Sequence, residues 1–257
     1  MTDLVSVADA NRVRTIRMNR PDKKNAITRP MYAAMADALS AANGDDVRVV
    51  IIAGAPGAFS AGNDLVDFME APPHIGGEDT PPVEDFMRAL LACEKPVIGA
   101  VDGLAVGIGT TLLLHCDLAY ATPRSMFTTP FVNLALAPEF GSSQVLPGIV
   151  GRAVASELLL LGAKWDAARA EAKSLINAVL PEAGFDAAVH AIAEDLAAKA
   201  PAAVKAAKAL ITTPEEDLHA RIVREGGIFA GQLRSQEFKE AATAFMERRA
   251  PDFSRFG

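Results

Sequence analysis

Residues 96–120 read PVIGAVDGLAVGIGTTLLLHCDLAY. The stretch begins with a β-rich run at 97–101, turns through glycine, and reaches Gly107-Ile108-Gly109 directly before an apolar run. This order predicts a strand, a tight glycine turn and a helix start. The first N–H groups of a helix have no intrahelical partner and lie at the positive end of its dipole, so they can donate to an oxygen that gains negative charge. Because glycine before a buried helix more often serves close packing, the interpretation needs a second donor from elsewhere in the chain.

A second stretch of the same kind lies earlier in the chain. Residues 47–53 form a β-branched, nearly continuous apolar run, which predicts a strand covered on both faces. The following residues, AFSAGNDL at 58–65, lead through small side chains towards a helix. This corner offers the Ala61 amide as the second donor. We expect Asp64 to cap the helix rather than to act as an acid or base.

Strands and helices alternate along the chain from residue 28 to residue 122. Such alternation predicts an α/β fold with a largely parallel sheet, whose ligands bind beyond the strand ends. Thr28 is the expected N-cap of a helix that ends near Asn43 and Gly44. The other expected elements are strands at 4–7, 12–18 and 125–128, a helix over 83–91, and a loop over 70–82.

From residue 152 to residue 248 the pattern is helical and rich in alanine. A helical region of this kind packs on the α/β core or on a neighbouring subunit. The apolar stripe of the final helix is expected to be core; its members are Phe238, Ala242, Phe245 and Met246. The expected breaks are at Gly162, at 181–184, at Pro201 and at Pro214.

Composition narrows the class of protein. The chain has 257 residues, of which 50% are hydrophobic and 22% charged, as in a folded globular protein. A net charge of −7 disfavours nucleic acid as a partner. No apolar run is long enough to span a membrane, and the N-terminus does not resemble a signal peptide, so we predict a cytoplasmic protein. Cys93, Cys116 and the four histidines lack metal-ligand spacing, which predicts neither a disulfide framework nor a metal site.

Several motifs in order resemble the crotonase superfamily, also called the enoyl-CoA hydratase/isomerase family. They are NRPDKKNAI at 19–27, AFSAGNDL at 58–65, DGLAVGIG at 102–109, CDLAY at 116–120, and AFMERRAPDF at 244–253. The resemblance implies an α/β, crotonase-like (ClpP/crotonase) spiral of ββα units with a C-terminal helical region. It divides the chain into a core at 1–195 and a trimerisation region at 196–257, and it implies a homotrimer or a hexamer built as a dimer of trimers.

The resemblance also implies a substrate and a site. An acyl-CoA thioester would lie with its carbonyl oxygen between the amides of Ala61 and Ile108. Coenzyme A is part of that substrate, so no separate cofactor is expected, and the basic loop at 20–26 would meet its phosphates and adenine. The residues expected to bind the CoA ester are Lys23, Lys24, Ala26, Ile27, Ser60, Gly62, Asn63, Asp64 and Leu65.

Side chains at the reacting carbons distinguish the reactions of this family. Its hydratases carry two glutamates, and the matching positions here are Thr111 and Phe131. The segment around Glu139 instead resembles the peroxisomal-type enoyl-CoA isomerases, in which one glutamate at this position shuttles the proton. This resemblance implies isomerisation of 3-enoyl-CoA to 2-trans-enoyl-CoA through a dienolate. The alternatives are a hydratase that uses Glu139 alone and a non-catalytic acyl-CoA-binding paralogue. His115 and Trp165 are expected to have packing roles.

Overall fold

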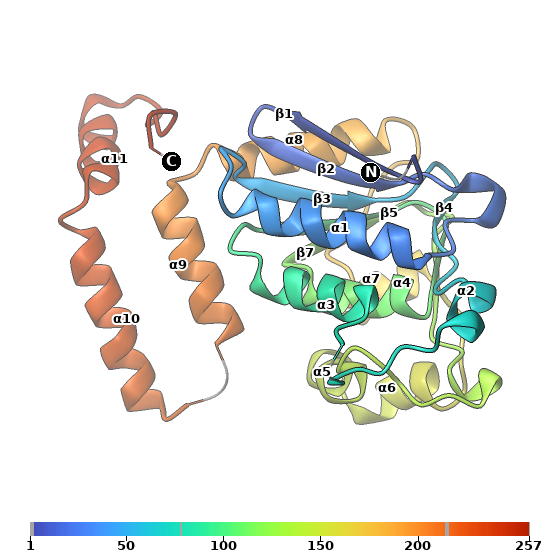
Figure 1. Cartoon of the computed structure of the whole chain (residues 1–257). Coiled ribbons are helices and arrows are strands. Elements are labelled where there is room, and N and C mark those ends of the chain that lie inside the picture. Colours follow the sequence, from blue (N-terminus) through green and yellow to red (C-terminus); the bar gives the residue numbers. More distant parts are fainter. Residues whose placement is uncertain (1–2, 78, 214–215, 257) are drawn as a thin grey trace.

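The computed structural model describes residues 3–77, 79–213 and 216–256. Two sheets form the core of the fold (Figure 1). The first has the order β1-β2-β3-β5-β7-β10 and is parallel except for the β1–β2 hairpin. The second has the order β4-β6-β8-β9, and only β9 runs antiparallel. The strands are β1 (Val5–Ala10), β2 (Val13–Met18), β3 (Val49–Ala53), β4 (Ala58–Ser60), β5 (Val97–Val101), β6 (Leu104–Val106), β7 (Leu118–Ala121), β8 (Met126–Thr128), β9 (Trp165–Asp166) and β10 (Ala178–Val179).

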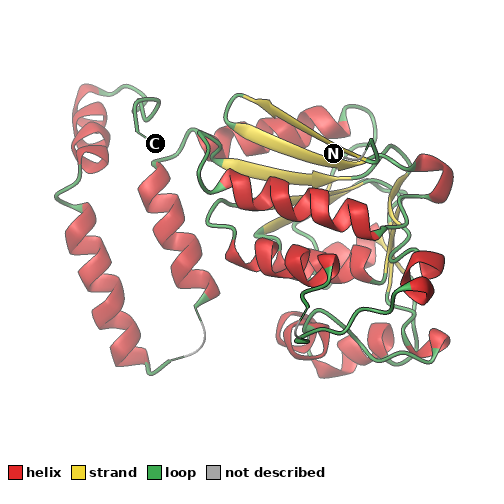
Figure 2. Ribbon diagram, viewed as in Figure 1, coloured by secondary structure: helices red, strands yellow, loops and turns green. Residues whose placement is uncertain are grey.

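Helices flank these sheets and continue beyond them (Figure 2). The α-helices are α1 (Arg29–Ala42), α2 (Leu65–Glu70), α3 (Pro82–Ala92), α4 (Ile108–Thr111), α5 (Ser142–Val150), α6 (Arg152–Leu159), α7 (Ala167–Ala172), α8 (Phe185–Ala197), α9 (Pro201–Thr212), α10 (Leu218–Gln232) and α11 (Gln236–Glu247). Three short 3-10 helices are η1 (Pro21–Lys23), η2 (Leu112–His115) and η3 (Val132–Leu134). The α/β class predicted from the sequence is confirmed.

Strand β3 has both of its faces covered, as its apolar run predicts. Val50 and Ile52 belong to the larger core cluster, which also holds the buried faces of α1 and α3. Val49 and Ile51 point to the opposite face and pack in a second cluster with α8. Because successive side chains of a strand alternate between faces, a strand between two helical layers needs apolar residues at every position.

Some local predictions were wrong. The stretch after β5 was expected to turn directly into a helix, but it first forms β6, a strand of three residues that joins the second sheet. Thr28 is the N-cap residue of α1, as predicted, although its side chain makes no capping hydrogen bond. The expected break at Pro214 lies outside the described residues.

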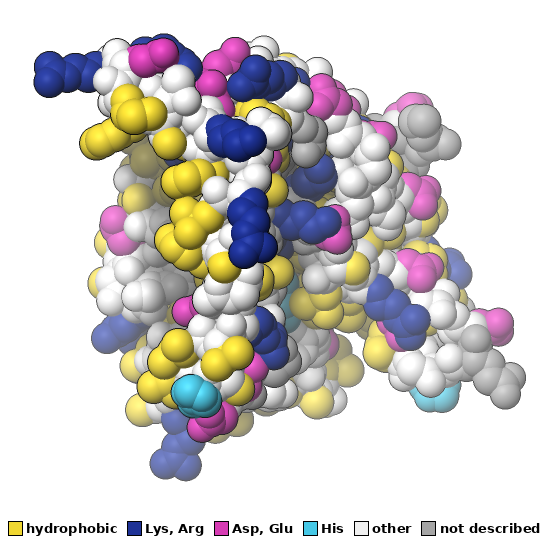
Figure 3. Space-filling view, turned by 90° about the vertical axis from the view of Figure 1, so that its left-hand side faces the viewer, with side chains coloured by type: hydrophobic (Ala, Val, Ile, Leu, Met, Phe, Trp, Pro, Cys, Tyr) yellow, Lys and Arg dark blue, Asp and Glu magenta, His cyan; other side chains and the backbone are white. Residues whose placement is uncertain are grey.

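The last three helices extend to one side of the core (Figure 1). The domain boundary predicted after residue 195 falls inside α8, and α9 begins at Pro201. The expectation that the stripe on α11 is core was wrong for this chain, because Phe245 is 86% exposed and Met246 is 74% exposed. Figure 3 shows this end of the molecule, where hydrophobic side chains gather in patches between basic ones. No helix of the described residues is long and apolar enough to cross a membrane.

Candidate active site

The candidate site is a cavity of about 600 Å³ where the two strand-to-helix corners meet. One corner joins β4 to α2, and the other joins β6 to α4. The cavity is also lined by Pro73 and Ile75 in the loop before α3, by Val83 and Met87 of α3, and by residues of the segment that ends at Glu139. Most of the lining side chains are apolar, which suits a ligand with a hydrocarbon portion.

The β4–α2 corner turns one backbone amide away from its neighbours. Ile27 donates its N–H to the Gly62 carbonyl at 2.8 Å, and its own carbonyl accepts from the Asp64 amide at 2.9 Å. In this parallel bridge the residue between the two partners, Asn63, directs its own N–H to the other side. Asn63 lines the cavity, and its backbone N–H has no hydrogen-bond partner among the described residues.

The prediction that the Ala61 amide is an available donor was wrong for this structure. The Ala61 N–H donates to the Lys24 carbonyl oxygen at 2.9 Å, so it is already paired. In a regular strand the amides of residues 61 and 63 would point to the same side. Gly62, with φ of 90°, breaks this alternation. The sequence places a donor in this corner but does not specify which of the two amides faces the ligand.

The β6–α4 corner presents the second amide. Gly107 has φ of 55°, and its carbonyl accepts the first helical hydrogen bonds from Thr110 and Thr111. The Ile108 amide at the start of α4 has no partner among the described residues, and Ile108 lines the same cavity as Asn63. The site therefore contains two unpaired backbone donors, as the sequence predicts, although one of them comes from a different residue.

Close backbone contacts hold the two corners together. A Cβ atom at Gly109 would lie 2.9 Å from the Ser60 carbonyl oxygen, and one at Gly62 would lie 2.9 Å from that of Val106. Only glycine permits such an approach. The two donor segments are thus in direct backbone contact.

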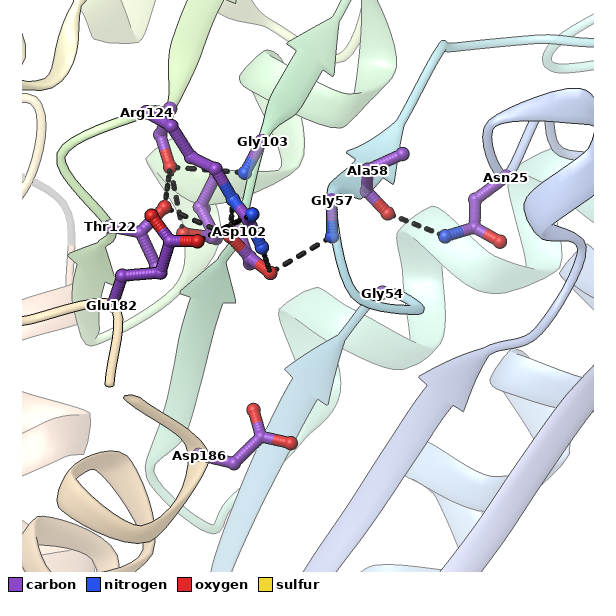
Figure 4. A network of polar contacts seen from close by, with 12 residues as sticks. Asn25, Gly54, Gly57, Ala58, Asp102, Gly103, Thr122, Arg124, Glu182 and Asp186 are labelled. Carbon is purple, nitrogen blue, oxygen red and sulfur yellow. Dashed lines mark hydrogen bonds and ion pairs between the residues drawn. The ribbon is translucent and has the colours of Figure 1, made fainter. Parts of the chain in front are cut away.

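A polar network stabilises the loops behind these corners (Figure 4). Asp102 accepts hydrogen bonds from the Gly57 amide at 2.9 Å, from the Thr122 hydroxyl at 2.9 Å and from the Arg124 guanidinium. The Asn25 side chain donates to the Ala58 carbonyl at 2.6 Å. These contacts tie the loops that precede β4 and β6 to neighbouring strands.

Glu139 lines the cavity, and its two carboxylate oxygens differ in their hydrogen bonding. Oε1 accepts a hydrogen bond from the Thr111 hydroxyl at 2.5 Å, and Oε2 is buried without a partner in the described structure. Burial raises the pKa of Glu139 to about 7, an effect that the Thr111 hydrogen bond partly offsets. A carboxyl group with this pKa can both take up and release a proton near neutral pH.

The residues predicted to bind a CoA ester divide into two groups. Six of them line the cavity: Lys23, Ala26, Gly62, Asn63, Asp64 and Leu65. Ile27 and Ser60 are fully buried and do not line it, and Ser60 instead donates to the Asn25 carbonyl at 2.9 Å. Lys24 is exposed and lies outside the cavity lining, and its carbonyl holds the Ala61 amide.

Asp64 and Arg20 form a structural pair. Asp64 caps α2 by accepting from the Val66 and Asp67 amides, as predicted. Its other oxygen accepts from Arg20 at 2.6 Å, so this guanidinium is engaged inside the protein. Within the described ranges, no group of three His, Cys, Asp or Glu side chains is placed to hold a metal ion.

Tyr32 was missed in the sequence. It is fully buried in α1, and its hydroxyl donates to Oδ1 of Asn63 at 2.5 Å. The helical pattern around residue 32 predicts a buried face but carries no signal that this hydroxyl contacts the donor corner. Burial raises the pKa of Tyr32 well above its ordinary value, so the hydroxyl stays a donor.

Comparison with known proteins identifies the family of this chain. The family model for enoyl-CoA hydratase/isomerase matches residues 8–255. Human enoyl-CoA delta isomerase 2 is 35% identical over 249 residues, which are 95% of this chain and 63% of that protein. The 2,3-dehydroadipyl-CoA hydratase of Escherichia coli K12 is 32% identical, covering 98% of this chain and 99% of the relative. A solved structure of a candidate enoyl-CoA hydratase/carnithine racemase from Magnetospirillum magneticum AMB-1 has a TM-score of 0.95 and 44% identity, covering 99% of this chain and 100% of the other.

The chain belongs to the enoyl-CoA hydratase/isomerase family. It spans less than two thirds of the human isomerase, and the relatives it matches are named for both isomerisation and hydration. The activity must therefore be argued from the side chains of the cavity.

Proposed function

We propose that this protein isomerises a 3-enoyl-CoA thioester to the 2-trans-enoyl-CoA, with Glu139 as the only acid and base. The observation that carries the proposal is one buried carboxyl group, with one oxygen unpaired, in the same cavity as the unpaired amides of Asn63 and Ile108. A reaction that moves one proton between two carbons of the same substrate needs a single group of this kind.

In the proposed mechanism the thioester oxygen accepts hydrogen bonds from the Asn63 and Ile108 amides. Oε2 of Glu139 takes the proton from the α-carbon, and the electron pair moves into a dienolate whose oxygen becomes negative. The same carboxyl group then gives its proton to the γ-carbon, which leaves the double bond between the α and β carbons. Loss of one preorganised oxyanion donor costs about 2.7–4 kcal/mol in other enzymes, so two such amides supply a large part of the stabilisation.

The cavity walls indicate how the substrate would lie. Lys23 stands at the basic loop and can pair with a phosphate of CoA, whereas Arg20 is held by Asp64. The acyl chain would lie along the apolar wall formed by Ile75, Val83 and Met87. Phe131 also lines the cavity, at the position that the resemblance assigns to the second glutamate of hydratases. Its ring is apolar and cannot accept a proton from a nucleophilic water.

Hydration of 2-enoyl-CoA is the second candidate, because relatives of similar identity are named hydratases. It would require Glu139 to activate the water and to protonate the α-carbon, and Thr111 would only position that carboxyl group. Assaying 3-enoyl-CoA and 2-enoyl-CoA substrates of several lengths separates the two reactions. A 3-hydroxyacyl product without isomerisation would reject our proposal in favour of hydration, and binding without turnover would favour a non-catalytic protein.

Glu139→Gln is the decisive variant. The change removes the base but keeps the shape of the side chain, so the CoA ester should still bind, and turnover should fall by at least about 10²-fold. Glu70→Gln is the matched control, because Glu70 is exposed on α2 and outside the cavity lining. Turnover of Glu139→Gln within a few-fold of the unsubstituted protein would reject Glu139 as the base.

We also propose that copies of the chain assemble through α10 and α11 as trimers or pairs of trimers. Leu218, Phe229 and Phe245 are 72%, 65% and 86% exposed, a pattern that favours contact with another surface. Sedimentation or light scattering measures the assembly directly. Phe245→Glu should weaken it, whereas a monomer at all concentrations of the unsubstituted protein would reject it.

A further inference from the structure

His115 lies next to the turn that carries the candidate base. Its Nε2 atom is 2.7 Å from the Phe140 carbonyl oxygen, and the two rings lie 4.0 Å apart at an angle of 30°. Because a carbonyl can only accept, Nε2 carries the proton in this contact. Burial lowers the pKa of His115, so the neutral ring is the dominant form near neutral pH.

The turn that His115 contacts contains two successive residues with positive φ. Phe140 has φ of 52° and Gly141 has φ of 66°, and both angles lie in the left-handed region. Glycine accepts this conformation readily, but a residue with a Cβ atom adopts it only when its surroundings favour it. Glu139 immediately precedes this pair, so the direction of its carboxyl group depends on the turn.

One helical segment contacts the turn from several positions. It consists of α4 and η2 and runs without a break from Ile108 to His115. Its first amide is the second donor, Thr111 binds the Glu139 carboxylate, and His115 binds the next carbonyl along the chain. Thr111 and His115 both contact the Glu139–Phe140 turn, so this turn lies against the segment at two points. The segment therefore sets the position of the base relative to the donor amide.

We propose that His115 is a positioning residue that holds the Glu139 turn in place against the segment carrying the Ile108 amide. The inference rests on the proposed function of Glu139 as the base. Thr111 fixes only one oxygen of the carboxyl group, and the Ser142 amide, which donates to the Glu139 carbonyl at 3.0 Å, closes the turn without joining it to α4 and η2. The contact between His115 and Phe140 joins the backbone of the turn to that segment, and the ring of Phe140 also packs against Phe86 with ring centroids 6.4 Å apart.

The test compares two substitutions at His115. His115→Met fills a similar volume but has no N–H donor, whereas His115→Gln keeps one. We expect His115→Met to lower kcat by about 10- to 100-fold with KM changed by less than about three-fold, because a small displacement of a catalytic group costs rate more than binding. His115→Gln should recover most of the lost kcat.

His190→Met is the matched control. His190 also makes one side-chain hydrogen bond, to Thr15 at 3.2 Å, but it lies on α8 away from the cavity. Its substitution should lower thermal stability without changing kcat by more than about two-fold. If His115→Met keeps full kcat, or if His115→Gln loses as much kcat as His115→Met, the positioning role is overturned and only packing remains.

A second readout does not depend on turnover. The Glu139 carboxyl carbon can be titrated by NMR, with Glu139→Gln used to assign its signal. In His115→Met the released turn should admit water, and the pKa should fall from about 7 by one unit or more towards the ordinary value. An unchanged pKa overturns the positioning role, whereas an unsubstituted protein without isomerase activity overturns only the proposed function.

Discussion

The Thr111 hydroxyl donates a 2.5 Å hydrogen bond to Oε1 of Glu139. The contact stabilises the ionised carboxylate, so it lowers the pKa that burial raises. Burial and the Thr111 hydrogen bond thus have opposite effects on the pKa of Glu139, and the effect of burial is the larger. The balance of burial and this hydrogen bond sets the pH at which Glu139 ionises.

Removing this hydroxyl should shift the pH profile. In Thr111→Val the pKa of Glu139 should rise by about half a unit to one unit, because one charge-assisted hydrogen bond is lost. The base works in its ionised form, so the acidic limb of the kcat profile should move to higher pH. Thr110→Val is the control, since the Thr110 hydroxyl donates to Ala105 and not to Glu139. A shift to lower pH, or the same shift in both variants, would contradict this explanation.

Glu139 should also reduce stability at neutral and alkaline pH. Its folded-state pKa of about 7 exceeds the ordinary value of 4.5, so the folded protein binds this proton more tightly than the unfolded chain does. The penalty is absent well below pH 4.5, grows as pH rises and is complete above pH 7.

Glu139→Gln should remove this penalty, because the glutamine side chain does not ionise. The variant should be more stable than the unsubstituted protein by about 3 kcal/mol at pH 8, with the difference vanishing near pH 4. Urea unfolding at several pH values measures this difference, and Glu70→Gln serves as the exposed control. Equal stability of Glu139→Gln and the unsubstituted protein at pH 8 would show that Glu139 is not desolvated.

The two donor segments should separate if a methyl group is added between them. A Cβ atom at Gly109 would meet the Ser60 carbonyl oxygen at 2.9 Å, and a backbone atom cannot rotate away. Gly109→Ala should therefore lower kcat by about 10-fold or more, because the proposed mechanism needs the Asn63 and Ile108 amides to reach the same thioester oxygen.

Gly148→Ala provides a control for the same chemical change. A Cβ atom at Gly148, inside α5, would meet no atom within 4 Å. This variant should keep its activity and gain about 0.5–1 kcal/mol of stability from helix propensity. Activity of Gly109→Ala equal to that of Gly148→Ala would show that the corner tolerates the displacement.

The sequence predicts those features that depend on local pattern. The continuous apolar run of β3, the glycine turn before Ile108 and the capping role of Asp64 all follow from residue type and spacing. Which amide of the β4–α2 corner faces the cavity does not follow, because the answer depends on a bridge to Ile27 from another part of the chain. The exposure of the apolar stripe on α11 does not follow from the sequence either. An amphipathic pattern predicts that a helix has an apolar face, but it does not predict which part of the structure covers that face.

The contact between Tyr32 and Asn63 leads to a final prediction about the first donor. The Tyr32 hydroxyl holds Oδ1 of Asn63 at 2.5 Å and so keeps this acceptor from turning towards the cavity, where it would compete with the substrate for the backbone amides. Tyr32→Phe should lower kcat by about 5- to 20-fold, because a free Oδ1 can occupy a donor that the dienolate needs. Adding Asn63→Ala to Tyr32→Phe should restore much of the rate, since the backbone amide remains and the competing oxygen is gone. Tyr120→Phe, on the opposite face of the sheet, is the control, and additive losses in the double variant would contradict the coupling.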